Sequence, residues 1–135
     1  GAPGLSGERL VRRLERLGLP GARFRPTSFR PGFQKHAGVT CGGAQLHVAD
    51  AESFLPYLTG VAVLAALRAG AGGRFAWREQ PYEFVSDRPA IDLLTGGAAV
   101  REGIEAGAPL AELQATWLPG QRDFIQCRRD FLIYL

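Results

Sequence analysis

Apolar residues recur at helical spacing near the beginning of the sequence. Ser6 precedes the run and is a residue type that caps helices, whereas Gly18 and Pro20 follow it and are residue types that end them. Apolar positions three and four residues apart lie on one side of a helix. The pattern predicts a surface helix that packs on a core through Leu10, Val11, Leu14 and Leu17.

Two later segments alternate in the manner of strands. In residues 22–27 arginines alternate with other residues, but Pro26 lacks an amide hydrogen, so this segment is predicted as a short edge strand. Residues 44–48 alternate cleanly between apolar and polar side chains. This second strand is predicted to present a polar face, formed by Gln45 and His47, that can meet a ligand.

The segment between these strands, residues 28–43, has neither a helical nor a strand period because prolines and glycines interrupt it. A loop of this length inside a compact domain is uncommon and is more often functional than not. Aromatic and basic side chains are interleaved in it, namely Phe29, Phe33, Lys35 and His36. We therefore interpret it as a candidate binding loop, with a purely structural loop as the alternative.

The rest of the chain is mainly helical in pattern. Residues 61–67 are apolar on every side and predict a central buried helix, opened by Asp50 or Ser53 with Pro56 in an early position, and ended by glycines at 70–73. The remaining expected elements are extended pieces at 75–77 and 82–85, a helix capped by Asp87 that runs to Leu94, and helices at 100–106, from Pro109, and around Phe124 after a break at Pro119 and Gly120. The predicted fold class is α/β (α+β mixed), a small sheet with several packed helices.

The composition fits one globular domain. The 135 residues are 46% hydrophobic and 21% charged, and they contain no repeat. We expect a single domain over residues 1–135, with residues 1–5 as a linker or an engineered remnant. Because the sequence holds no Met, we expect it to be a piece of a longer protein. The longest uncharged run, residues 53–67, is too short for a membrane span of about 20 apolar residues, so no span is predicted.

Charge is distributed unevenly. Residues 1–36 contain eight basic and two acidic side chains, although the formal net charge of the whole chain is only +3. Such asymmetry attracts an anionic ligand, a nucleic acid or an acidic partner. Four of the arginines, at positions 9, 12, 13 and 16, have helical spacing opposite the apolar stripe, and we interpret them as a solvated helix face.

Most catalytic and metal-binding patterns are absent. Cys41 and Cys127 have neither CxxC spacing nor a neighbouring His pair, so no metal or cofactor is predicted, and buried free thiols are expected while a disulfide remains open. Glu79 and Glu83 are separated by Pro81, and we interpret them as solvated acids rather than as the acid pair of a glycosidase. No catalytic residue is predicted in this chain.

The remaining candidate is a binding surface. Arginines at 23 and 25, the aromatic residues of the 28–43 loop, and the Gln45 and His47 side chains together suit a polar, anionic ligand such as an acidic sugar.

An ordered set of motifs covering nearly the whole chain resembles the NamZ-type exo-β-N-acetylmuramidases of bacteria. The motifs are Phe24-Arg25-Pro26, the stretch FRPGFQK at 29–35, the stretch CGGAQLHV at 41–48, Tyr82-Glu83-Phe84, and the stretch DRPAIDLLTG at 87–96.

The resemblance implies an enzyme that removes N-acetylmuramic acid from the non-reducing ends of peptidoglycan fragments in cell-wall turnover. It also implies a larger Rossmann-like N-terminal domain that carries the catalytic acids, and a smaller C-terminal domain that helps to form the cleft. This chain resembles the C-terminal domain, whose partners would be the catalytic domain and peptidoglycan fragments; whether the parent protein is cytoplasmic or exported stays open. The lactyl carboxylate of muramic acid would be contacted by Arg25, Arg30 or Lys35, and the implied substrate-binding set is Arg25, Arg30, Lys35, Gln45 and His47.

Two alternatives belong to other functional classes. The first is a non-catalytic domain that packs on a partner domain or on a second copy of itself without binding a ligand. The second is nucleic-acid binding, which the low net charge and the acidic remainder of the chain disfavour.

Overall fold

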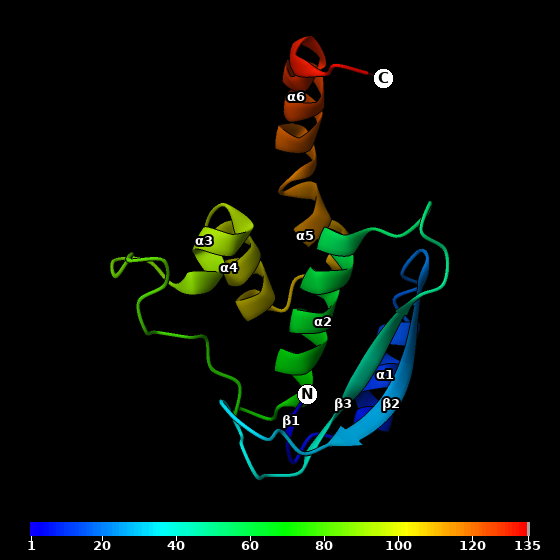
Figure 1. Ribbon diagram of the computed structural model, residues 1–135, viewed down its shortest axis with the longest axis vertical. Coiled ribbons are helices and arrows are strands. Elements are labelled where there is room, and N and C mark those ends of the chain that lie inside the picture. Colours follow the sequence, from blue (N-terminus) through cyan, green and yellow to red (C-terminus); the bar gives the residue numbers. More distant parts are fainter. Residues whose placement is uncertain (135) are drawn as a thin grey trace. The chain divides into compact units, whose positions relative to one another are not determined.

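The structure is a computed structural model that describes residues 1–134. The chain divides into two compact units, Gly1–Ala76 and Trp77–Leu135, and each is described by itself. The first unit contains a small sheet and two helices, and the second is built from short helices (Figure 1). This arrangement confirms the predicted α+β class.

The sheet of the first unit has three antiparallel strands in the order β1, β3, β2. The strands are β1 (Ala2–Pro3), β2 (Ala22–Phe29) and β3 (Cys41–Val48). Strand β2 lies at an edge, as Pro26 predicts, but β2 and β3 both extend into the predicted 28–43 loop. The loop between them is therefore shorter than expected and covers residues 30–40.

The segment expected to be a linker, residues 1–5, has a structured role instead. Ala2 pairs with Gly42, and Pro3 pairs with Cys41. Strand pairing joins residues far apart in the sequence, so the local composition of this segment gave no sign of it. Residues 1–5 thus belong to the fold of the first unit.

Helix α1 (Gly7–Glu15) forms where the apolar stripe predicts it. The Ser6 hydroxyl accepts a hydrogen bond from the Arg9 amide at 3.3 Å and caps the first turn. Leu10, Val11 and Leu14 are buried, and the helix packs on β2 and β3. Leu17 lies beyond the helix end and is 41% exposed, so it is not part of the core stripe.

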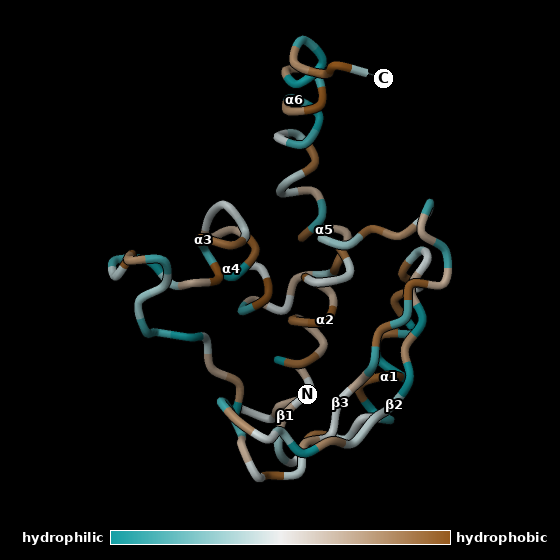
Figure 2. Tube along the Cα trace, in the orientation of Figure 1, coloured by the Kyte–Doolittle hydropathy of each residue, from teal (hydrophilic) through white to brown (hydrophobic). Residues whose placement is uncertain are grey.

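Helix α2 (Pro56–Gly70) also matches its prediction, with Pro56 in the first turn and Val61, Ala62 and Ala66 buried. Most of this helix is coloured from white to brown in Figure 2, in keeping with its apolar sequence. Its N-terminus lacks the predicted side-chain cap: Leu55 occupies the capping position. Asp50 instead closes a turn, because its carboxylate accepts hydrogen bonds from the Glu52 amide and the Ser53 hydroxyl.

The second unit contains α3 (Ala90–Thr95), α4 (Ala99–Ala106), α5 (Leu110–Ala115) and α6 (Leu118–Arg128), and a 3-10 turn follows at Arg129–Phe131. Its core is small and consists of Ala90, Val100, Ile104 and Leu113. No residue of α6 is buried. Within residues 1–134, no helix is long and apolar enough to cross a membrane.

Three predictions for the chain after α2 are wrong. Asp87 does not cap α3, because Pro89 holds an extended conformation (φ −59°, ψ 143°) at the capping position and the helix begins at Ala90. The expected extended pieces form no regular strand, and only Tyr82 and Val85 make an isolated bridge. Pro119 lies in the first turn of α6, which begins at Leu118, and does not break a helix, since the first turn tolerates proline.

Candidate functional site

Three of the five predicted binding residues meet on the sheet. Arg25 lies opposite Gln45, and the Arg25 guanidinium donates a hydrogen bond to the Gln45 side-chain oxygen. His47 lies opposite Arg23, two pairs further along the ladder. Directly opposite residues of an antiparallel pair point to the same face, and positions two apart along a strand do so as well. Arg23, Arg25, Gln45 and His47 therefore form one exposed cluster, here called the strand-face cluster.

The other two predicted residues lie in the 30–40 loop, where they behave differently from each other. The Arg30 Nε atom donates a hydrogen bond to the Gly38 carbonyl at 2.6 Å, and the Gly38 amide donates to the Pro31 carbonyl at 2.8 Å. Arg30 is thus committed to closing the loop. The Lys35 ammonium group has no hydrogen-bond or ion-pair partner among residues 1–134, and Lys35 lines a cavity.

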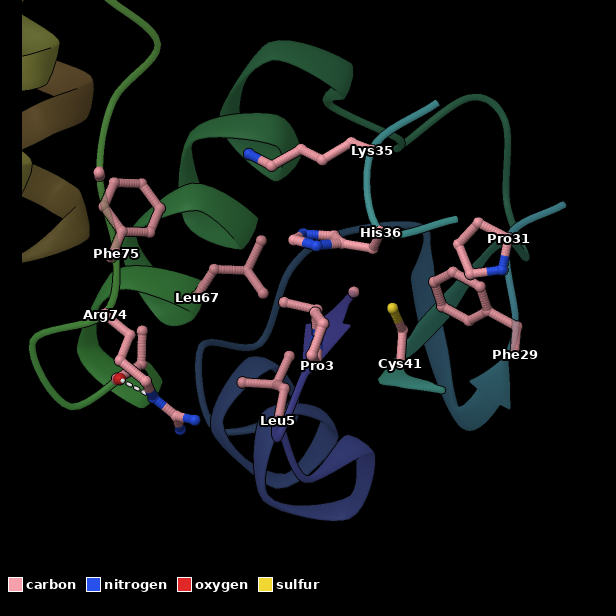
Figure 3. A pocket seen from close by; sticks show the side chains of 14 residues that line it. Pro3, Leu5, Phe29, Pro31, Lys35, His36, Cys41, Leu67, Arg74 and Phe75 are labelled. Atoms are coloured by element: carbon pink, nitrogen blue, oxygen red, sulfur yellow. Dashed lines mark hydrogen bonds between the residues drawn. The ribbon is translucent and has the colours of Figure 1, made fainter. Parts of the chain in front are cut away.

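This cavity lies wholly within the first unit and has a volume of about 660 Å³. Its walls come from β1, the 30–40 loop and the end of α2, and Figure 3 shows Lys35 and His36 reaching from the loop toward the side that carries Leu67 and Phe75. The lining is mostly apolar. Its apolar side chains are those of Pro3, Leu5, Phe29, Pro31, Cys41, Leu67 and Phe75.

The register places the cavity and the strand-face cluster on the same side of the sheet. Phe29 is opposite Cys41, and Cys41 is opposite Pro3 across the other edge of β3. Phe29 lies four residues after Arg25 on the same strand, so it faces the same way, roughly 13 Å further along. The two features are therefore neighbouring parts of one surface, with a polar end and an apolar end.

The loop over the cavity holds two strained backbone positions. Gln34 and His36 have φ angles of 60° and 63°, in the left-handed region that non-glycine residues rarely adopt. Hydrogen bonds from the Ala37 amide to the Gln34 carbonyl (3.2 Å) and from the Val39 amide to the His36 carbonyl (3.0 Å) hold this conformation. The strained backbone brings the His36 side chain to the cavity.

Sequence reasoning noted His36 as a loop residue but did not place it in the binding set. The available signal was its position next to Lys35 in a long loop, whereas the left-handed backbone that orients it cannot be deduced from residue type alone. The His36 side chain, like that of Lys35, has no hydrogen-bond or ion-pair partner in the part of the chain described here.

The two cysteines are free and lie in different surroundings. Cys41 is fully buried and its thiol donates to the Val39 carbonyl at 3.6 Å, whereas Cys127 is exposed. The expectation of a buried thiol is thus correct for Cys41 and wrong for Cys127, since α6 packs on too little to bury it. Residues 1–134 contain no cluster of three or more side chains suited to hold a metal ion.

Sequence reasoning missed a polar network in the second unit. The Arg101 guanidinium binds both carboxylate oxygens of Asp92, at 2.8 and 3.0 Å, and also contacts Glu105 at 3.3 Å. Glu105 in turn accepts a hydrogen bond from the Trp77 indole at 2.8 Å. The hydrogen bonds to Asp92, followed by the negative charges of Asp92 and Glu105, raise the pKa of Arg101 above its ordinary range. The network joins α3 to α4 and is structural in character.

Comparison with known proteins decides the family. The family model described as "Exo-beta-N-acetylmuramidase NamZ, C-terminal" matches residues 1–134. The chain belongs to this family. Peptidoglycan β-N-acetylmuramidase NamZ of Bacillus subtilis is 32% identical over 134 residues, which cover 99% of this chain and 30% of that protein. The chain thus spans about a third of the length of this NamZ relative.

A solved structure supports the fold of the NamZ C-terminal family. A crystal structure of a DUF1343 family protein from Bacteroides fragilis matches 99% of this chain and 34% of its own, with a TM-score of 0.79 at 22% identity. At that identity the likeness establishes the fold alone.

Proposed function

We propose that this chain forms part of the substrate-binding cleft of a NamZ-type exo-β-N-acetylmuramidase, where it contacts peptidoglycan fragments that end in N-acetylmuramic acid. The surface made by the strand-face cluster and the adjoining cavity carries this proposal. Its cationic groups suit an anionic sugar, and its apolar end suits the non-polar parts of that sugar. The catalytic carboxylates are expected in an N-terminal domain, and this chain supplies binding contacts only.

The electrostatic part of the proposal rests on few side chains. In the strand-face cluster, Arg25 and Arg23 provide the fixed positive charges, while Gln45 orients the Arg25 guanidinium through their hydrogen bond. A guanidinium that is already held in place loses less conformational freedom when it binds a carboxylate or a sugar hydroxyl. His47 adds a ring nitrogen on the same face.

The test is an amide NMR titration of the chain. The ligand is the disaccharide with N-acetylmuramic acid at its non-reducing end, and the N-acetylglucosamine dimer is the control ligand. We expect selective shifts within residues 23–47 for the muramic ligand, weakened in Arg25→Gln and unchanged in Arg13→Gln, which removes the same charge from the exposed face of α1. Equal responses to both ligands, or none to either, would contradict the proposal.

A second candidate function is a packing surface for the catalytic domain, and the end of the chain favours it. Phe124, Phe131, Ile133 and Tyr134 are 64%, 79%, 93% and 84% exposed. Figure 2 shows hydrophobic and hydrophilic residues alternating along α6. Phe124, Cys127 and Phe131 recur at spacings that place them on one side of a helix. Exposed apolar stripes of this kind mark interaction surfaces.

This second candidate commits to the catalytic domain as the occupant, because the chain spans only 30% of its B. subtilis relative. We expect the chain to bind the remaining part of that relative when the two are mixed, and Phe124→Ser with Phe131→Ser to abolish the binding measured by fluorescence anisotropy. Neither residue is buried, so folding is retained. A dimer in sedimentation equilibrium that the same substitutions dissolve would assign the surface to self-association instead.

A further inference from the structure

The cavity beside the strand-face cluster is mostly apolar, and two of the polar side chains that line it have no partner in the described part of the chain. The Lys35 ammonium and the His36 imidazole lack partners among residues 1–134, and both line the cavity. Arg25 and Arg30 do not line the cavity, and each donates a hydrogen bond elsewhere, to Gln45 and to Gly38. A carboxylate held inside the cavity would therefore find free donors at Lys35 and His36.

We propose that this cavity is the subsite for the lactyl group of N-acetylmuramic acid. The inference rests on the proposed function and locates the lactyl carboxylate at Lys35 and His36 rather than at Arg25 or Arg30. The lactyl group is a short ether-linked propionate, which presents one carboxylate and one methyl group. The carboxylate suits the free donors of Lys35 and His36, and the methyl group suits the apolar wall of the cavity.

The positive end of the cavity is built by the loop. Lys35 supplies a charge, and the left-handed backbone at His36 (φ 63°) turns the imidazole to the same side, as Figure 3 shows. A carboxylate can accept hydrogen bonds from both side chains at once. Arg74 also lines the cavity, but its Nε atom donates to the Ala71 carbonyl at 3.2 Å and its Nη2 atom contacts the Gly4 carbonyl at 3.5 Å, so its guanidinium ties two segments together.

The apolar wall suits the methyl group and one face of the sugar ring. Leu67 and Phe75 stand opposite the loop, and Pro3 lies between them and Cys41 (Figure 3). The volume of about 660 Å³ falls within the range of small-molecule sites and exceeds what a lactyl group alone requires. The cavity can therefore take the lactyl group with part of the pyranose ring.

The experiment compares three monosaccharide ligands by amide NMR titration of the chain: N-acetylmuramic acid, its methyl ester and N-acetylglucosamine. The ester removes the carboxylate charge, and N-acetylglucosamine removes the whole lactyl group. We expect N-acetylmuramic acid to shift the amides of Lys35, His36, Cys41, Leu67 and Phe75, with binding about tenfold or more weaker for the ester, because a charge-assisted hydrogen bond is lost.

Substitutions then assign the contact. Lys35→Ala and His36→Asn are each expected to weaken the binding of N-acetylmuramic acid about tenfold and to leave the binding of the ester unchanged. Lys35→Arg is expected to retain binding of the acid. Asparagine is chosen at position 36 because it tolerates the left-handed backbone. Arg9→Ala, on exposed α1 surface, is the matched control and should change nothing.

The outcomes separate the two proposals. Shifts confined to Arg25, Gln45 and His47, with no response around the cavity, would overturn the lactyl subsite and leave the proposed function standing. The absence of any selective response to N-acetylmuramic acid would overturn both. Equal binding of the acid and its ester at the cavity would also overturn the subsite, because the carboxylate would then play no part.

Discussion

The integration of the first five residues into the sheet can be tested at Gly42. A Cβ atom at this position would overlap the Leu5 carbonyl oxygen and lie 3.0 Å from the carbonyl carbon. Both atoms belong to the backbone, so no side-chain rotation can relieve the contact. Gly42→Ala therefore has to push Leu5 away from β3, and Leu5 lines the cavity as well.

The magnitude follows from two opposing effects. Overpacking a well-filled site costs about 1–3 kcal/mol. Replacing glycine by alanine returns roughly 0.4–1 kcal/mol by restricting the unfolded chain. We expect Gly42→Ala to lower the free energy of unfolding by about 1–2 kcal/mol. Gly60 provides the opposite case, because it lies inside α2 with open space around its Cβ position, and Gly60→Ala should stabilise by about 0.5–1 kcal/mol.

Urea unfolding followed by far-ultraviolet circular dichroism measures both variants. Tryptophan fluorescence is unsuited to the purpose, since Trp77 and Trp117 both belong to the second unit. The decisive quantity is the sign of each change in free energy. If Gly42→Ala proved as stable as the parent chain, or more stable, then residues 1–5 would not be held against β3 and the cavity would lack one of its walls.

The remaining predictions concern other parts of the chain. Hydrogen bonds from the Ser53 hydroxyl and the Glu52 amide lower the pKa of Asp50. The stabilising contribution of the Asp50 carboxylate is therefore complete above the unfolded pKa and is lost as the pH falls through the folded pKa. Ser53→Ala should raise this pKa toward its ordinary range in a carboxyl NMR titration, and an unchanged pKa would contradict the assignment. Arg101→Lys should lower the thermal midpoint because lysine cannot bind both oxygens of Asp92 at once, and a midpoint equal to that of the parent would show that the paired geometry contributes nothing. Leu113→Ala, at a side chain only 1% exposed, should cost about 2–5 kcal/mol in urea unfolding, and a cost below 1 kcal/mol would mean that the core of the second unit is loosely packed.

Local signals were sufficient for the two helices of the first unit. A capping serine, an apolar stripe and a terminating glycine all occur within one segment, and α1 follows them. The proline of the first turn and the apolar run likewise predicted α2. The cap expected at Asp50 or Ser53 failed because these two side chains bond to each other in a preceding turn.

The strands were predicted less completely because their length depends on partners elsewhere in the chain. The alternation in residues 44–48 is present, yet Leu46 and Val48 are 41% and 51% exposed. The covering helix α1 packs more extensively on β2 than on β3, so the apolar side chains at this end of β3 stay partly exposed.

The candidate site was predictable in its residues but not in its grouping. Arg25, Gln45 and His47 come together only because the register sets Arg25 opposite Gln45, and the sequence does not specify that register. Lys35 was recognised as a loop cation. Its role differs from that of Arg30 because the Arg30 side chain is bonded to the Gly38 carbonyl, which residue type alone does not reveal. Tertiary contacts thus divided one predicted set into a strand-face cluster, a loop-closing residue and a cavity residue.

The same division explains the basic N-terminal half of the chain. The arginines at positions 9, 12, 13 and 16 are exposed, and those at 9, 12 and 13 lie on α1 away from its buried stripe, as the interpretation of a solvated helix face predicted. Only a small part of the excess positive charge of residues 1–36 is therefore available to a ligand at the proposed surface. That part comes chiefly from Arg23, Arg25 and Lys35. A carboxylate at the cavity would interact mainly with one lysine at short range. Binding of N-acetylmuramic acid should accordingly weaken only modestly with salt, in contrast to the steep dependence that several phosphate contacts with a nucleic acid would produce.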